Sequence, residues 1–326
     1  MISDDFAFMD LITGYQPAAL ITAATRLGVF DAIDVEPRSA ADVAAVLATD
    51  PSTTAAMLES LHRIGLAERH DDRYAATGYV AQRLTGDGEM RLLVAKEAVF
   101  ADAWLHLEDV ARSGKPAMEA WRSRLKTNPA QARAFLEALD VLARISGPRL
   151  EDLPELAPGK KVVDVGGGLG SYARKLVHAG SSVVLVDLPE VIGWAQGALR
   201  DLDPSALELR VGDVLQDPAC AVDPESMDSA LVSHMLHDLT ADVAIDLLGR
   251  AAKTLRSGGH VVVNDFAGDS GPGAFGPLFD VMMKVETGGG AHDLASLRAM
   301  LAAAGLRSVR QVPYPEPVTV LIGETK

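Results

Sequence analysis

The second half of the chain alternates aliphatic runs with amphipathic stretches. From residue 160 onward the aliphatic runs include "KVVDVGGG", "SVVLVDLP", "LELRVGDVL", "DSALVSHML" and "GGHVVVNDF", and stretches such as "YARKLVHAG" and "ADVAIDLLGRAAKTL" lie between them. Continuous aliphatic strands separated by amphipathic helices are typical of a mostly parallel sheet that is covered on both faces. The pattern predicts an α/β fold with a Rossmann-like doubly wound sheet, whose ligands bind at the carboxyl ends of the strands.

The first 90 residues have a different pattern. Residues 1–33 space their apolar side chains helically, and Gly28 is a natural stop. Ser39 and Asp42 have the spacing of a capping box, and "DPSTTAAMLESLHRIG" is typical of a capped helix. "LAERHDDRYAAT" indicates two short strands around a polar turn. Helix, helix and hairpin in this order predict a winged helix.

The middle of the chain is interpreted as a connector. Residues 91–150 look helical, with breaks at "SGKPA" and "TNPA", and "PELAPGK" then marks a boundary. We therefore expect a winged-helix-like domain over residues 1–95, a helical connector that lines a pocket over 96–150, and a ligand-binding domain over 151–326.

A winged helix raises the hypothesis of DNA binding, and the charge argues against it. Residues 1–90 hold 6 Arg or Lys against 14 Asp or Glu, and the whole chain carries a formal charge of −15. Nucleic acids and anionic membrane surfaces select basic patches. The sequence therefore predicts no nucleic-acid partner and a packing and dimerisation role for the first domain.

Composition narrows the class of protein further. The chain has 326 residues, 48% of them hydrophobic, which is typical of a globular protein with a sizeable core. We find no apolar run near the roughly 18 residues of a membrane span, and the acidic start lacks the basic region of a signal peptide. The single cysteine, Cys220, fits a reducing compartment. These features predict a cytoplasmic protein that does not enter a membrane.

A glycine turn follows the first strand of the α/β region. In "VVDVGGGLGSYARKL", Gly166, Gly168 and Gly170 let the backbone approach a ligand closely, while Ser171 replaces the third glycine of the dinucleotide fingerprint. Asp164 lies two residues before the first of these glycines. A carboxylate there suits a ligand that carries positive charge and no pyrophosphate, which describes S-adenosyl-L-methionine.

Two further strands end in acidic residues. Asp187 closes "VVLVDLP", 21 residues after Gly166, where a carboxylate can accept the ribose hydroxyls. Asp213 follows "ELRVG" and is placed to accept an adenine amino group, and Val214 can pack on the adenine ring. Three acidic strand ends in order, together with the glycine turn, predict a nucleoside site for S-adenosyl-L-methionine.

With these motifs the chain resembles the small-molecule O-methyltransferases of plants and of bacterial antibiotic pathways. The resemblance covers nearly the whole length and includes "DVGGGLG", "VDLPEVI", "GDVL", "LHDL" and "GGHVVVND". It implies a class I methyltransferase domain, a winged-helix dimerisation domain, and a homodimer in which the partner's N-terminal segment helps to close the pocket. It also implies that His237 is the catalytic base and that Asp265 orients it.

The stretch around the implied base holds further polar residues. Ser233 takes the place of a lysine that plant members carry near the adenine. His234 either lines the cofactor pocket or finishes the strand, and Asp238 is open between an orienting, a ligand and a capping role. A neutral imidazole near pH 7 suits His237 as a base.

One segment departs from the family pattern. Where the family reads Gly-Gly-x-Glu-Arg-Thr, this chain has "GGGAHD", so that Ala291 replaces the glutamate and His292 the arginine. One interpretation is drift, with Asp293 as a helix cap. The other is a metal site, in which His237 and His292, with Asp238 or water, bind one Fe or another divalent ion.

The two interpretations predict different chemistry at the same site. A metal would chelate an α-keto acid and stabilise its enolate, whose β-carbon is then methylated. This arrangement resembles the α-keto-acid C-methyltransferases of non-ribosomal peptide pathways, and we favour it at this point. The competing expectation is O-methylation of a phenol or hydroxyl with His237 as base. A third is a family member that binds the cofactor without transferring its methyl group.

Overall fold

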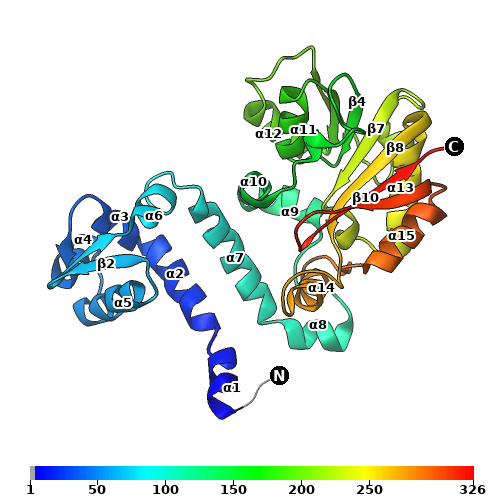
Figure 1. Cartoon of the computed structure of the whole chain (residues 1–326). Helices are drawn as coiled ribbons and strands as arrows, with labels where there is room; N and C mark the ends of the chain where they lie inside the picture. Colours follow the sequence, from blue (N-terminus) through cyan, green and yellow to red (C-terminus); the bar gives the residue numbers. More distant parts are fainter. Residues whose placement is uncertain (1–3) are drawn as a thin grey trace. The chain divides into compact units, whose positions relative to one another are not determined.

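The computed structural model describes residues 4–326 (Figure 1). The chain divides into two compact units, Met1–Ala101 and Asp102–Lys326. Residues 102–150, which the sequence assigns to a connector, belong to the second unit.

The first unit is a bundle of short helices with a small antiparallel sheet. The strands pair in the order β1-β3-β2, and Tyr74 of β3 packs in the core with Phe30, Leu58 and Leu61. Its elements are α1 (Asp5–Ile12), α2 (Tyr15–Leu27), α3 (Val29–Asp34), β1 (Arg38–Ser39), α4 (Ala40–Leu47), α5 (Pro51–Arg63), β2 (Ala67–His70), β3 (Arg73–Ala76), α6 (Gly78–Arg83) and α7 (Met90–Trp104), which runs on into the second unit.

The order α4, α5, β2, β3 confirms the expected helix–helix–hairpin arrangement. Local capping explains where these helices begin. The hydroxyl of Ser39 accepts the backbone N–H of Asp42, and the Asp42 carboxylate accepts the N–H of Ser39, which is a complete capping box. Asp50 caps α5 by accepting the Thr53 N–H at 2.7 Å. Gly28 ends α2 at a φ of +80°, a left-handed conformation that glycine adopts without strain.

The second unit is a three-layer α/β structure. Its helices and 3₁₀ turns are α8 (Leu107–Ser113), α9 (Trp121–Thr127), α10 (Pro129–Ser146), η1 (Leu150–Asp152), α11 (Ser171–His178), α12 (Pro189–Ala198), η2 (Pro218–Ala221), η3 (Leu236–Asp238), α13 (Ala241–Lys253), α14 (Phe275–Glu286) and α15 (Leu294–Ala303). Its strands are β4 (Lys161–Val165), β5 (Ser182–Asp187), β6 (Leu207–Val211), β7 (Met227–Ser233), β8 (Leu255–Phe266), β9 (Arg307–Val312) and β10 (Val318–Glu324).

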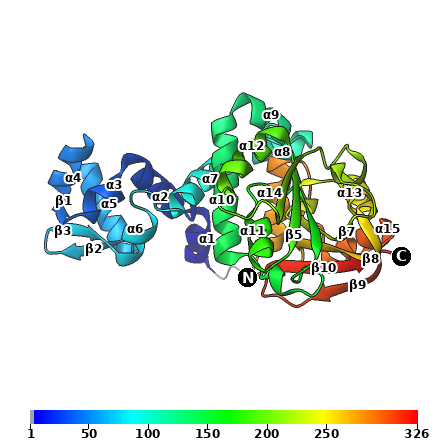
Figure 2. The same cartoon turned by 90° about the horizontal axis from the view of Figure 1, so that it is seen from above.

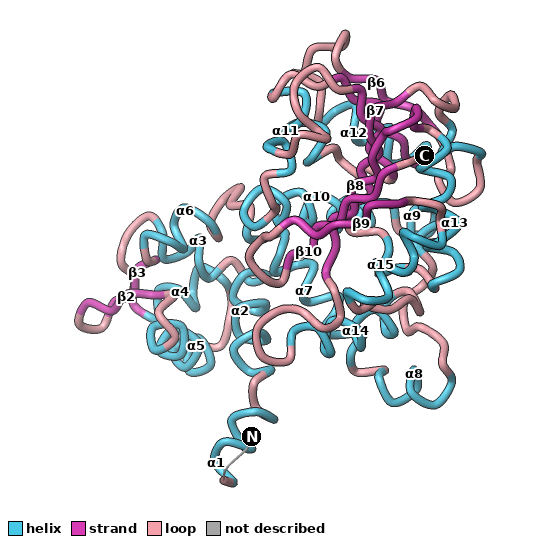
Figure 3. The backbone as a smooth tube through the Cα atoms, turned by 45° about the vertical axis from the view of Figure 1, so that its right-hand side comes forward, coloured by secondary structure: helices cyan, strands magenta, loops and turns pink. Residues whose placement is uncertain are grey.

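These strands form one seven-stranded sheet in the order β6-β5-β4-β7-β8-β10-β9. The five strands from β6 to β8 are parallel, which confirms the predicted doubly wound arrangement. β10 pairs antiparallel with both β8 and β9. Figure 3 shows the strands in magenta with helices to either side.

Two apolar cores lie on opposite faces of the sheet, and Figure 2 shows the helices that cover each face. On one face α13 and α15 bury Leu247, Leu248 and Leu301 against Val163 and Val261. On the other face Leu176 of α11 and Ile192 of α12 are buried against side chains of the strands. These strand residues are Val162, Leu185 and Leu231. Burial on both faces explains why the strands read as aliphatic throughout.

Among the described residues, no helix is both long enough and apolar enough to cross a membrane.

Candidate active site

The glycine turn sits between β4 and α11, at the carboxyl end of the sheet. Gly166, Gly168 and Gly170 have φ values of +67°, +59° and +84°, which L side chains rarely adopt. A Cβ on Gly166 would lie 2.2 Å from the Met235 sulfur, and one on Gly170 would lie 2.4 Å from a Leu199 methyl carbon. A Cβ on Gly168 would lie 4.0 Å from its nearest neighbour, a Leu136 methyl carbon. The turn is therefore crowded at Gly166 and Gly170 and open at Gly168.

Asp164 presents a buried carboxylate to this turn. Its Oδ2 atom is buried and has no hydrogen-bond partner among residues 4–326. Burial, and then the neighbouring charge of Asp187, raise the pKa of Asp164 to about 7. A buried acceptor without a partner costs free energy, and a ligand ammonium group would supply both the hydrogen bond and the charge. The residues present therefore fit the amino group of S-adenosyl-L-methionine.

Asp187 ends β5 beside the glycine turn, as the sequence predicts. Its carboxylate accepts the N–H groups of Gly168 at 2.9 Å and Leu188 at 2.7 Å. Burial raises the pKa of Asp187 to about 6 in spite of these two bonds.

Asp213 lies just beyond β6 and has a partner that the sequence does not reveal. Its Oδ1 atom is 2.5 Å from the Arg122 guanidinium on α9 and also accepts the Leu215 N–H. Val214 is buried in the core with Cys220 and Val222. An adenine amino group that bonds to Asp213 must therefore share this carboxylate with Arg122.

His237 and Asp265 form a pair at the carboxyl ends of β7 and β8. His237 belongs to η3, and Asp265 lies near the end of β8, where both of its oxygens are used. Its Oδ1 atom is 2.5 Å from His237 Nδ1, and its Oδ2 atom accepts the Leu236 N–H at 3.1 Å. Because a carboxylate accepts, Nδ1 of the imidazole carries the proton, and Nε2 is left for other chemistry. The pairing brings together the two residues that the resemblance implies.

Carboxylates dominate the charge around His237. Burial alone would lower its pKa, but the charges of Asp265, Asp238 and Glu286 outweigh burial and raise the pKa to about 9. The imidazolium form is therefore favoured at pH 7.

A hydrogen-bonded network centred on Asn264 includes His234. His234 has a φ of +52° and packs on the Phe266 ring with centroids 4.7 Å apart. The amide nitrogen of Asn264 lies within 3.2 Å of His234 Nε2, Ser233 Oγ and Tyr172 Oη. Burial lowers the pKa of His234 to about 4, so it is neutral. Ser233 is thus tied to the protein interior.

A buried ion pair joins α9 to the end of α14. Arg124 Nη1 on α9 is 3.1 Å from Glu286 Oε1 at the end of α14, and each side chain is only 8% exposed. The structure therefore pairs Glu286 with a buried arginine. Asp238 faces the same region, with its Oδ1 atom 3.8 Å from His237 Nε2.

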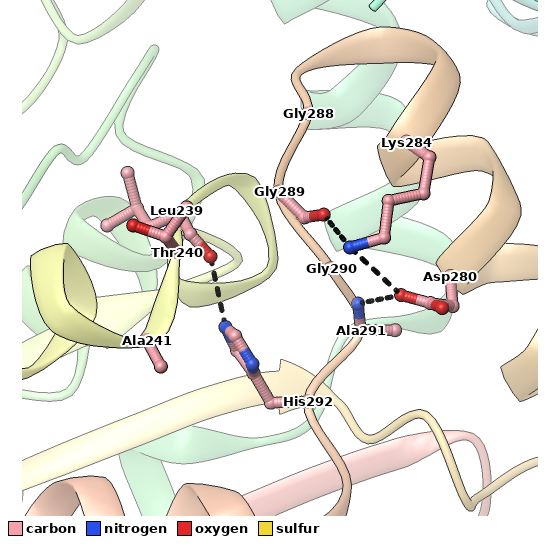
Figure 4. Close-up of a pocket in the computed structure, with 10 residues that line it drawn as sticks. All are labelled: Leu239, Thr240, Ala241, Asp280, Lys284, Gly288, Gly289, Gly290, Ala291 and His292. Carbon is pink, nitrogen blue, oxygen red and sulfur yellow. Dashed lines mark hydrogen bonds and ion pairs between the residues drawn. The ribbon is translucent and has the colours of Figure 1, made fainter. Parts of the chain in front are cut away.

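His292 lies at the rim of a cavity of about 290 Å³ (Figure 4). The cavity is lined by residues 239–241 and 288–292 together with Asp280 and Lys284. The imidazole Nε2 of His292 is 3.1 Å from the carbonyl oxygens of both Leu236 and Leu239. Two carbonyl acceptors require Nε2 to be the protonated nitrogen. His292 therefore holds the backbone around η3 in place.

Asp238 does not complete a three-residue ligand group with His237 and His292 in the described part of the chain. Among residues 4–326, the potential ligand group with donor atoms within 4.8 Å of one another contains His234, His237 and Asp265, and not His292 or Asp238. The donor atoms of that group are bonded to each other, to backbone N–H groups or to Asn264. The side chains present therefore fit an internal hydrogen-bond network better than an Fe site.

Comparisons with known proteins agree with this geometry. The O-methyltransferase domain family matches residues 104–307, and the O-methyltransferase dimerisation domain matches residues 9–85. The chain belongs to the O-methyltransferase family. It is an S-adenosyl-L-methionine-dependent methyltransferase with an N-terminal dimerisation domain.

Curated relatives of this methyltransferase include two enzymes from antibiotic producers. It is 27% identical to the O-demethylpuromycin-O-methyltransferase of Streptomyces alboniger, over 93% of this chain and 84% of that one. It is also 27% identical to the 3-hydroxy-5-methyl-1-naphthoate 3-O-methyltransferase of Streptomyces sahachiroi, over 94% and 91%.

Solved structures share the fold over the full length. The mitomycin 7-O-methyltransferase MmcR has a TM-score of 0.86 at 23% identity, covering 99% of this chain and 98% of that one. The human N-acetylserotonin methyltransferase, solved with its methyl donor, has a TM-score of 0.83 at 23% identity, with 99% of both chains covered.

Proposed function

We propose that this methyltransferase transfers the methyl group of S-adenosyl-L-methionine to a hydroxyl oxygen of a small aromatic molecule. The observation that carries the proposal is the His237–Asp265 pair, with Nδ1 and Oδ1 2.5 Å apart. A hydroxyl acceptor must lose a proton, and this pair provides an oriented nitrogen base for it. Three of the four proteins named above are O-methyltransferases by name, which supports the same acceptor atom.

Each side chain has a separate task in this mechanism. Asp164 binds the amino group of the cofactor, Asp187 its ribose hydroxyls, and Asp213 its adenine amino group. When bound, the cofactor supplies an electrophilic methyl group. His237 Nε2 accepts the acceptor's hydroxyl proton, and Asp265 keeps the ring in the tautomer with Nδ1 protonated. The rest of the rate enhancement comes from holding the reactants in line.

The raised pKa of His237 is compatible with this role. A base whose pKa is about 9 is closely matched to a phenol, whose pKa is about 10. The positive sulfonium of the cofactor would also oppose a positive imidazolium, which favours release of the His237 proton before the acceptor reacts.

A panel of hydroxylated aromatic acceptors tests this proposal. The enzyme is incubated with methyl-labelled S-adenosyl-L-methionine and with phenols, naphthols and hydroxylated aromatic acids. Mass spectrometry then locates the label. A methyl ether as product supports the proposal. Label on carbon, with phenylpyruvate or another α-keto acid as the acceptor that turns over, would contradict it.

Metal-assisted C-methylation of an α-keto acid is the competing proposal. It requires a bound Fe or other divalent ion, with His237 and His292 as ligands. The loss of a carboxylate at Ala291 supports it, whereas the two carbonyls that engage His292 Nε2 favour the O-methylation proposal. Elemental analysis after Fe(II) loading and dialysis separates the two. Near one equivalent of metal, lost in His292→Ala, would support C-methylation.

We also propose that the enzyme works as a homodimer built on residues 1–95. Helix α1 exposes several large apolar side chains to solvent in the isolated chain, namely Phe6, Phe8, Met9, Leu11 and Ile12. Apolar side chains gathered on one short helix are typical of a surface that a partner covers. Sedimentation of the full chain should give twice the mass of 34.4 kDa.

A further inference from the structure

Helices α9 and α10 contact residues at the carboxyl ends of three parallel strands, β4, β5 and β6. At the end of β5, Leu125 of α9 and Ala132 of α10 are buried against Val191 of α12 (Figure 2). Leu188, the residue that follows Asp187, packs against the same cluster. The segment that the sequence assigns to a connector therefore lies directly against the strand ends at which the cofactor is expected to bind.

One side of α10 follows the glycine turn after β4. Leu136 and Asp140 are four residues apart, so they lie on the same side of this helix. A Leu136 methyl carbon is the nearest neighbour of a Cβ built on Gly168, at 4.0 Å, and the Ser171 hydroxyl donates to the Asp140 carboxylate at 2.6 Å. α10 is thus anchored beside the one position of the turn that is open.

α9 reaches the end of β6 through Arg122. Its Nη2 atom is 2.5 Å from Asp213 Oδ1, and the same oxygen accepts the Leu215 N–H at 3.1 Å. Both of these contacts use Oδ1. They leave Oδ2 of Asp213 for an adenine amino group.

This ion pair contributes little to folding. The side chains of Arg122 and Asp213 are 49% and 22% exposed, and an ion pair in contact with water adds little to the free energy of unfolding. A cation that engages one oxygen of a carboxylate does restrict the rotation of that carboxylate, and so it fixes the direction of the other oxygen. The contact therefore bears on what Asp213 can recognise.

We propose that Arg122 is a positioning residue for the adenine of S-adenosyl-L-methionine, and that it holds the Asp213 carboxylate so that Oδ2 accepts the adenine amino group. The inference rests on the proposed role of Asp213 in adenine binding, and it does not depend on which acceptor is methylated. The segment from α9 to α10, residues 121–146, gives Arg122 a fixed base, because Asp140 anchors α10 at Ser171.

A purely structural role for Arg122 predicts a different pattern of binding. If Arg122 acts through Asp213, its loss should weaken only those ligands that carry the adenine amino group. If it only secures α9, its loss should weaken all nucleoside ligands alike. S-adenosylhomocysteine and S-inosylhomocysteine separate the two cases, because a carbonyl oxygen replaces the amino group in the second ligand.

The test is calorimetric titration of the full-length enzyme with each of these two ligands. The variants are Arg122→Gln, Arg122→Lys, Asp213→Asn and the double variant Arg122→Gln/Asp213→Asn. Arg133→Gln is the matched control, because Arg133 lies on α10 and pairs with Glu137 of its own helix at 2.8 Å. Thermal unfolding of each variant shows that it is folded.

We expect Arg122→Gln to weaken the binding of S-adenosylhomocysteine roughly fivefold, the upper range for an exposed ion pair. Its affinity for S-inosylhomocysteine should stay close to that of wild type. Arg122→Lys should recover part of the loss, because it keeps a cation. In the Asp213→Asn background Arg122→Gln should have no further effect, since the two side chains act as one unit. Arg133→Gln should bind both ligands like wild type.

Equal weakening of the two ligands in Arg122→Gln would overturn the inference and leave Arg122 as a contact that secures α9. An unchanged affinity for S-adenosylhomocysteine in Arg122→Gln would overturn it as well. Wild-type binding by Asp213→Asn would remove its basis, because the adenine amino group would then be bound elsewhere. None of these outcomes bears on O-methylation, because both ligands are titrated without an acceptor.

Discussion

The Oδ1 atom of Asp265 accepts a hydrogen bond from His237 Nδ1–H at 2.5 Å, while its Oδ2 atom accepts one from the Leu236 N–H. One carboxylate therefore fixes both the ring and the backbone beside it. The consequence is that Nε2 is the nitrogen left to meet a substrate proton.

Replacing Asp265 by Asn tests this orientation. An amide at this position can donate to Nδ1 and so favour the tautomer in which Nε2 carries the proton and is no longer a base. We expect kcat to fall by about 10²-fold or more, with the affinity for S-adenosylhomocysteine unchanged. Steady-state kinetics and calorimetry measure the two quantities. A loss of cofactor affinity equal to the loss of kcat would instead indicate local misfolding.

The raised pKa of His237 makes stability depend on pH. Because its pKa is about 9 in the folded chain and about 6.5 in the unfolded chain, its contribution is fully present below about pH 6.5 and is lost as pH rises through about 9. The free-energy difference between wild type and His237→Gln should shrink over this interval. Urea unfolding of both proteins at several pH values measures it. A difference that grows with pH would contradict the assigned partners of His237.

Asp164 should make cofactor binding depend on pH. Its pKa of about 7 means that the carboxylate must lose a proton before it can pair with an ammonium group. Affinity for S-adenosylhomocysteine should therefore rise with pH up to about 7 and then level off. Asp164→Asn should bind weakly and with a smaller pH dependence. Calorimetry in two buffers of different ionisation enthalpy detects the released proton directly.

The glycines of the turn offer a matched pair of substitutions. Both Gly168 and Gly170 have positive φ, so alanine at either should cost about 1–2 kcal/mol of unfolding free energy. At Gly170 the new methyl group would also meet Leu199 at 2.4 Å, which adds about 1–3 kcal/mol for overpacking. Gly170→Ala should thus be the less stable variant in denaturant unfolding. Equal losses of unfolding free energy in the two variants would show that the core around α12 accommodates the added methyl group without overpacking.

The parts of this molecule that depend on local pattern were predictable. The strand ends at Asp164 and Asp187 and the glycine turn follow from aliphatic runs and residue spacing, and the capping box at Ser39 follows from three-residue spacing. The meeting of His237 with Asp265 came from family resemblance, since 28 residues separate them.

The parts that depend on distant contacts were not predictable. Arg122 and Arg124 look like ordinary charges of a short helix, and nothing in their spacing reveals Asp213 or Glu286 as partners. The same limit applies to His292, because its partners are backbone carbonyls of another segment. The segment "FDVMMKVETGG" carries a lysine and a glutamate that are unusual in such a helix, and a buried glutamate needs a partner, but the sequence does not reveal its burial.

The most direct test of the central claim is the single-turnover rate of methyl transfer in His237→Ala, measured beside its affinity for S-adenosylhomocysteine. We expect a methyl ether product, a rate lower by about 10²–10⁴-fold, and an affinity close to that of wild type. Transfer at the wild-type rate, or transfer to carbon, would contradict O-methylation with His237 as the base.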